Sequence, residues 1–223
     1  MLTDLLAQVD TGGHGGSTAH LLVLQVLRWA HFFFGIAWIG HLYYFNFVQA
    51  HAEKVLDGPQ KKIVVPNFRG RAIWWFRWGA MLTFLTGLAY ILYQELIATS
   101  NHFSGWLSFG PGGAGPSNAW ILFGALLGTI MWFNVWFVIW PRQKKILGAM
   151  LGGPAAPPTA APQAALASKI NTYLSGPMLW GMVAGSHPDI WPLYIATLVL
   201  SVVLAVGLIH GLYAKSRKVP TTI

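Results

Sequence analysis

The sequence predicts an all-α fold: a polytopic membrane helix bundle of about five transmembrane helices. Of its 223 residues, 55% are apolar and only 9% are charged, whereas soluble domains carry about 25% charged residues. Several apolar segments also reach the roughly 20 residues that a helix needs to cross a bilayer. Both observations predict a multi-pass protein in contact with lipid, and we expect it in the bacterial cytoplasmic (inner) membrane.

The apolar segments and their breaks divide the chain into three parts. Residues 1–17 form a short exterior segment, residues 18–213 a single helix-bundle domain and residues 214–223 a basic cytoplasmic tail. The expected transmembrane helices cover residues 18–51, 73–97, 118–140, 166–186 and 190–213.

Prolines and polar residues set the expected helix ends. Gly58-Pro59 and Pro66 should break any helix before residue 73, and Pro141 should end the third helix. A Pro/Ala-rich stretch at 148–165 indicates a flexible linker. The fourth helix is interrupted by polar residues and a proline, which must face other helices or a cavity, namely Asn171, Thr172, Ser175 and Pro177.

The basic residues predict the orientation. Lys and Arg are concentrated in residues 52–72, 141–169 and 214–223, and are absent from residues 1–19, 100–117 and 186–192. Five helices place the first three segments on one side of the membrane and the last three on the other. The positive-inside rule then puts the N-terminus outside and the C-terminus in the cytoplasm. The net charge of +8 is thus explained by topology, and no nucleic-acid partner is expected.

Small and aromatic residues have recognisable positions in this scheme. Gly124 and Gly128 form a G-x-x-x-G pair, and Gly79 and Gly87 give the second helix a stripe of small residues. Such positions let helix backbones approach closely, either within this chain or in docking to another subunit. Tryptophans gather where helices should meet the membrane interfaces, as at Trp74, Trp75, Trp78, Trp106, Trp140 and Trp191.

The histidines are the candidate redox ligands. The chain has no cysteine, so iron–sulfur clusters and covalently attached haem c are not expected. Haem b held by histidines is the simplest redox centre available, with His31, His41, His187 and His210 as candidate iron ligands. His31 and His41 are about 280° apart around one helix and cannot bind the same iron. A hydrogen bond to a neighbouring helix or a proton relay are the alternatives for each histidine.

Two arginines and two asparagines accompany these histidines. Arg28 and Arg77 can each pair with a haem propionate, an anionic substrate or a lipid headgroup, or can simply extend to the interface. Asn46 and Asn134 are expected to form hydrogen bonds between helices. No nucleophile set, carboxylate pair or phosphate loop can be assembled, so hydrolytic chemistry is not expected.

Three segments together resemble a known family. RWAHFFFGIAWIGHLYYFNFV, FRWGAMLTFLTGLAYIL and NTYLSGPMLWGMVAGSHP resemble the membrane domain of the bacterial membrane-bound urate hydroxylases. That family joins its membrane domain to a cytochrome c domain and oxidises urate to 5-hydroxyisourate. The resemblance implies Arg28, His31 and His187 as catalytic residues and Arg77 as a cofactor-binding residue, whereas His41 and His210 rest on helix geometry alone.

Two main hypotheses follow for the function. The first is a redox-linked, urate-oxidising membrane oxidoreductase that passes electrons to a separate cytochrome c, because this chain has no cytochrome c domain of its own. The second is a non-catalytic accessory subunit of a larger respiratory or photosynthetic membrane complex. Transport, through the interrupted fourth helix, is a third hypothesis.

Overall fold

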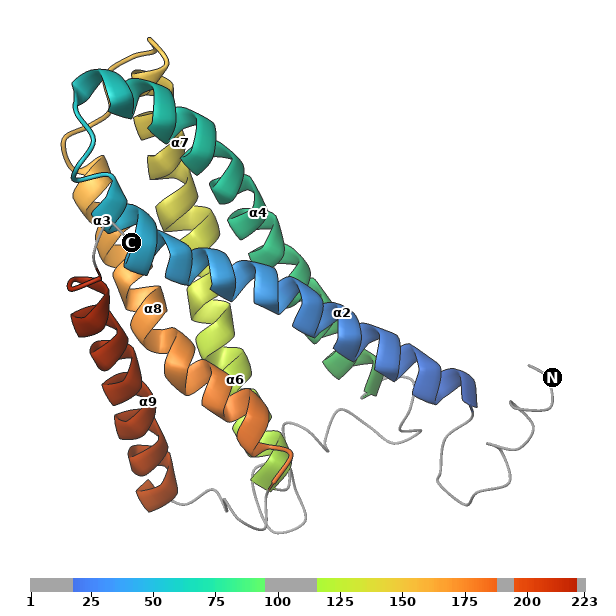
Figure 1. Cartoon of the computed structure of the whole chain (residues 1–223). Helices are drawn as coiled ribbons and strands as arrows, with labels where there is room; N and C mark the ends of the chain where they lie inside the picture. The colour runs from blue at the N-terminus through green and yellow to red at the C-terminus, as the bar shows by residue number, and fades with distance from the viewer. Residues whose placement is uncertain (1–17, 95–115, 188–194, 220–223) are drawn as a thin grey trace.

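The computed structural model describes residues 18–94, 116–187 and 195–219, which form five long helical rods (Figure 1). Two of the rods contain a π-helical segment and three are uninterrupted α-helices. The rods are α2 (Thr18–Tyr43) with η1 (Tyr44–Gln49) and α3 (Ala50–Ala52), α4 (Gly58–Tyr93), α6 (Pro116–Phe133) with η3 (Asn134–Ile139) and α7 (Trp140–Met150), α8 (Ala160–Ala184) and α9 (Ile195–Ser216). The predicted all-α helix bundle is confirmed.

Three of these rods are long and apolar enough to cross a membrane: Ala19–Ala52, Ala119–Met150 and Ile195–Ser216. Within the described residues, α4 and α8 are as long but do not reach that hydropathy. Arginines and lysines in the first half of α4, and the polar residues of α8, lower their hydropathy. The three apolar rods carry many exposed large apolar side chains, such as Ile36, Leu126 and Leu208, as expected for contact with lipid tails.

The second helix begins 15 residues before the predicted start at residue 73, because Gly58 and Pro59 open α4 instead of breaking it. Asp57 accepts a hydrogen bond from the Gln60 amide, and the Gln60 side chain accepts one from the Asp57 amide, which makes a capping box. Pro59 lies in the first turn, where no amide hydrogen is needed. Pro66 lies inside the helix, and packing against α2 and α7 outweighs its cost of about 3 kcal/mol.

The prediction that Pro141 ends the third helix is also wrong, because the rod continues as α7 to Met150. Pro141 is the second residue of α7, which directly follows the π-helical segment η3. In a π-helix the hydrogen bonds run over five residues instead of four, so the register shifts just before the residue that lacks an amide hydrogen. The wider turn absorbs the proline and the rod extends by about two and a half turns.

Helix α8 begins at Ala160, six residues before the predicted start, and runs unbroken through Pro177. Ala160, Ala164 and Ala167 are buried, and alanine is the strongest helix former. Part of the predicted linker is therefore helix. The expected loop at residues 100–117, the N-terminal segment and the turn at 188–189 lie wholly or mostly outside the described residues.

The core lies where α2, α4, α6, η3 and α8 meet, and it consists of buried apolar side chains. Its members include Trp38, Leu42, Phe76, Met131 and Val135. The predicted small-residue contacts are made within this chain. A Cβ built at Gly79 would lie 3.0 Å from the Trp38 nitrogen, and one built at Gly181 would lie 2.9 Å from both the Gly124 nitrogen and the Trp120 oxygen.

Basic residues converge on one end of the bundle. The end of α9 reaches α3 through Ser216 and His51 (3.4 Å), Arg69 of α4 pairs with Glu53, and Arg142 of α7 donates to Gln163 of α8 (2.7 Å). Figure 1 shows α3, the first turns of α4 and α7 gathered at that end. Every Lys and Arg of the chain except Arg28 and Arg77 belongs to the segments that meet there, which is the distribution the predicted orientation requires.

The contact between Gly124 and Gly181 gives a stability prediction. Gly181→Ala places a methyl group against backbone atoms of α6, which cannot rotate away as a side chain can. We expect a loss of about 1–3 kcal/mol of stability, measured as a lower midpoint of thermal unfolding in detergent. Gly207→Ala is the matched control, because a Cβ at Gly207 meets no atom within 4 Å; equal midpoints for the two variants would contradict the close helix contact.

Candidate functional site

His31 lies between α2 and α4, in a space that a glycine leaves open. Its Nδ1 is 2.9 Å from the Thr83 carbonyl oxygen, and a Cβ at Gly87 would lie 2.9 Å from its Cε1. A carbonyl oxygen can only accept, so Nδ1 carries the hydrogen and donates. Nε2 of the neutral ring is therefore the nitrogen left to accept a proton or to bind a metal.

Arg28 lies one turn before His31 and also faces α4. It donates to the Tyr90 hydroxyl at 2.5 Å, with its guanidinium 5.3 Å from the centre of the Tyr90 ring. α2 and α4 thus bring a cation and an imidazole onto one face. The three-residue spacing of Arg28 and His31 places both side chains on the same face of α2.

The other candidate histidines lie elsewhere. Nδ1 of His41 is 2.6 Å from the Ala37 oxygen of its own helix, and Nδ1 of His210 is 3.1 Å from the Tyr173 hydroxyl. His187 is exposed, just beyond the end of α8. Figure 1 shows the N-terminal half of α2, the helix that carries Arg28 and His31, running away from α8 and α9.

Two of the four candidate histidines, His31 and His41, are oriented as metal-ligating histidines usually are. His31 and His41 each place Nδ1 against a carbonyl oxygen, which is how metal-ligating histidines are usually oriented, with Nε2 left for the metal. Among the described residues, no group of three or more His, Asp or Glu side chains is positioned to hold a metal ion. The chemistry of the rings fits haem b, but the contacts found for the four histidines join no two of them.

Arg77 lies among three indole rings. Its guanidinium carbon is 4.0 Å from the centre of the Trp140 ring, 5.2 Å from Trp136 and 5.6 Å from Trp78. Its Nε is buried and has no hydrogen-bond partner among the described residues. The sequence identified Arg77, but not this aromatic surround, because Trp136 and Trp140 come from another rod.

The polar residues of α8 form a completely buried face. Asn171, Thr172 and Ser175 are each 0% exposed. Asn171 donates to the Met131 oxygen at 2.9 Å and accepts from Asn134 at 2.8 Å, while Thr172 and Ser175 donate to carbonyls of their own helix. Ser168 extends this face, so the spacing of the four is i, i+3, i+4 and i+7, a helical pattern that the sequence displays.

Side chains from α2, η1 and α9 close this polar face. The Tyr43 hydroxyl is 2.9 Å from the Ser175 hydroxyl, and Asn46 donates to Ser168 at 2.8 Å. Tyr213 donates to Asn46 at 2.8 Å and stacks on Tyr173 at 5.4 Å between ring centres. Tyr43, Tyr173 and Tyr213 did not emerge from the sequence as members of a site, since aromatic residues are frequent throughout the chain.

Both π-helical segments direct an asparagine at α8. Asn46 lies in η1 and Asn134 opens η3, and their amides reach Ser168 and Asn171. The predicted interhelical hydrogen bonds of these two asparagines are confirmed. π-Helical turns are frequent at functional sites, so two of them at one polar face indicate the candidate functional site of the bundle.

Loss of the Asn171 amide should destabilise the bundle. Asn171→Leu keeps the branched shape of the side chain but removes both hydrogen bonds, leaving the half-buried amide of Asn134 without its acceptor. We expect a loss of about 1–3 kcal/mol, seen as a lower thermal midpoint. Asn67→Leu is the control, because Asn67 is exposed and bonds only to Ile63 of its own helix; an equally large effect there would refute the importance of the buried pair.

Residues 114–221 match the family described as urate oxidase N-terminal. No curated protein and no solved structure is significantly similar to the chain. The matched segment includes α6, η3, α8 and α9, which supply most of the buried polar face. The resemblance to the membrane-bound urate hydroxylases is thereby confirmed over those residues. With its membrane-length helices, the chain is an integral membrane protein whose residues 114–221 match the urate oxidase N-terminal family.

Proposed function

We propose that this chain is the membrane module of a urate-oxidising system in the bacterial inner membrane, and that it delivers electrons to a separate cytochrome c. The observation that carries the proposal is the family match over residues 114–221. The reaction adds the hydroxyl of water to C5 of urate, giving 5-hydroxyisourate, two protons and two electrons. The protons need a basic group near the substrate, and the two electrons need an acceptor, here the cytochrome.

In this proposal Arg28, His31 and His187 are the catalytic residues. Urate is an anion at neutral pH, and Arg28 supplies the cation that holds it, a role that its exposure and its position beside His31 support. His31 accepts a proton on Nε2, since Thr83 fixes Nδ1 as the donor. His187, exposed beyond the end of α8 and on the predicted outer face, takes the second proton, although it lies apart from Arg28 and His31.

The polar face of α8 has a supporting role in the proposal. Its amides and hydroxyls fix how α2, η1 and α9 are held against α8. Arg28 and His31 belong to the same rod as Tyr43 and Asn46. The network therefore positions the catalytic rod relative to α8, which leads to His187.

Urate-dependent reduction of added cytochrome c by the purified protein tests the proposal. We expect two electrons per urate consumed, and a loss of about a hundredfold in turnover for His31→Ala and for His187→Ala, the usual range for a missing acid–base group. His51→Ala is the control, because His51 lies at the basic end and its side chain has, within the part of the chain that the structure describes, a single 3.4 Å contact with the Ser216 hydroxyl. Unchanged turnover in both variants would remove the two histidines from the site.

The same assay distinguishes the accessory-subunit hypothesis from the enzyme proposal. No urate consumption with cytochrome c or with an artificial acceptor would contradict the enzyme proposal. Elution of the native protein in a large assembly in mild detergent would then favour the subunit.

Haem b is the cofactor that we propose for the module, with His31, His41, His187 and His210 as candidate ligands. When bound, haem iron carries single electrons between the substrate and the acceptor. We expect a reduced-minus-oxidised spectrum of haem b, with about one or two haems per chain by pyridine haemochrome assay. A protein that is free of haem yet still oxidises urate would remove haem from the proposal.

A further inference from the structure

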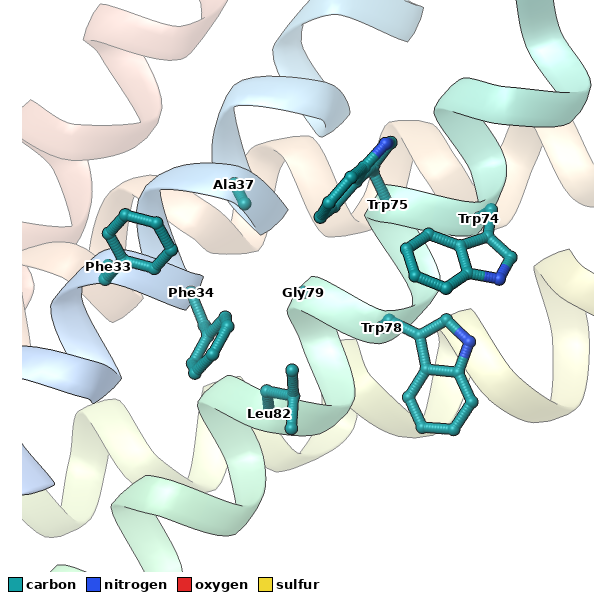
Figure 2. A pocket seen from close by; sticks show the side chains of 8 residues that line it. All are labelled: Phe33, Phe34, Ala37, Trp74, Trp75, Trp78, Gly79 and Leu82. Carbon is teal, nitrogen blue, oxygen red and sulfur yellow. The ribbon is translucent and has the colours of Figure 1, made fainter.

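A groove between α2 and α4 is lined only by apolar side chains and reaches Arg77 through a shared tryptophan (Figure 2). Its volume is about 210 Å³. The lining residues are Phe33, Phe34 and Ala37 of α2 and Trp74, Trp75, Trp78, Gly79 and Leu82 of α4. Figure 2 shows the three indoles along α4, with the phenylalanines on the facing helix and Leu82 at the far end from Trp74 and Trp75.

The groove is open to the outer surface of the bundle. Trp74, Trp75 and Trp78 are 48%, 57% and 38% exposed, which is unusual for indoles unless lipid or a partner covers them. From Trp74 to Leu82 the helix rises about 12 Å. This direction leads away from the basic end and into the apolar part of the bundle, as an acyl chain does from its headgroup.

Arg77 supplies a cation beside the groove. Trp78 lines the groove and also lies under the Arg77 guanidinium. Of the carboxylates in the described residues, Glu53 pairs with Arg69 and Asp57 caps α4. No hydrogen bond or ion pair to Arg77 is found among the described residues, so its charge is balanced by no acidic side chain there.

The position of Arg77 along the bundle matches the depth at which lipid headgroups lie in a membrane. Trp140 and Trp136 hold its guanidinium, and the basic segment with Arg142 and Lys144 follows directly after Trp140. Tryptophan belts mark the interface between the hydrocarbon and the headgroups. The planar guanidinium stacked on indoles still presents its terminal nitrogens to a phosphate.

We propose that this groove and Arg77 form a binding site for one anionic phospholipid, with its phosphate on Arg77 and an acyl chain along Trp74, Trp78 and Leu82. The site is independent of the proposed urate chemistry, since it uses neither Arg28 nor the histidines. Bound lipid neutralises the arginine and covers the exposed indoles where α2 crosses α4.

Native mass spectrometry of the full chain in detergent tests the site, with dioleoyl phosphatidylglycerol and dioleoyl phosphatidylcholine as probes. We expect one phosphatidylglycerol to bind at least about tenfold more tightly than phosphatidylcholine, and Arg77→Gln to abolish this preference. Arg71→Gln is the matched control, because it removes an exposed arginine from the same helix. Loss of preference in both variants, or in neither, would overturn the proposal.

A second variant tests the groove itself and does not depend on the folding of Arg77→Gln. Ala37→Phe fills the groove and should weaken phosphatidylglycerol binding by about tenfold, whereas Leu88→Phe, on an exposed position outside the groove, should not. Competition by inorganic phosphate at the concentration of the lipid would show an anion site without a chain site. Displacement of the lipid by a quinone equally in wild type and Arg77→Gln would instead assign the groove to a neutral redox lipid.

Discussion

The buried polar face of α8 is the constraint on which the rest of the bundle depends. Asn171, Thr172 and Ser175 have no contact with solvent, and an amide or hydroxyl that loses its hydrogen bond in an apolar interior costs several kcal/mol. Each must therefore be satisfied inside the protein. Thr172 and Ser175 use carbonyls of their own helix, but Asn171 needs groups from the facing rod.

This requirement explains why two rods change their helical geometry. η1 and η3 interrupt the α-helical hydrogen bonding at Asn46 and Asn134, and both amides reach α8. A π-helical turn has a less favourable backbone than an α-helical one, and the interhelical amide bonds offset that cost. The same shift in register accommodates Pro141, so the polar contact and the length of the third rod have one structural origin.

The α2 and α4 pair is held in a different way, by close backbone approach and by cations on aromatic rings. Gly79 allows the backbone of α4 to approach Trp38, and Gly87 leaves room for His31. Arg28 and Arg77 both lie over aromatic rings, at Tyr90 and among three tryptophans respectively. The bundle thus keeps two of its proposed catalytic residues, Arg28 and His31, toward one end of α2 and its proposed lipid site nearer the basic end, with the α8 network connecting the rods between them.

The sequence alone determined the class of the protein and the identity of most candidate residues. Low charge, long apolar segments and the arrangement of Lys and Arg depend only on composition and order along the chain. The hydrogen bonding of Asn46 and Asn134 was predictable because an amide in an apolar helix must find a partner. Arg28 and His31 were predictable as neighbours since helical periodicity fixes their spacing.

Only the tertiary structure decided which residues from different rods meet. Pro66 and Pro141 stop a helix by local rules, but packing against neighbouring rods and a π-helical turn overrule those rules here. The aromatic surround of Arg77 combines α4 with η3 and α7, and the closure of the α8 face by Tyr43 and Tyr213 joins residues more than 130 positions apart. No pattern along the chain specifies such contacts, because they depend on how the rods cross and not on the period of any one helix.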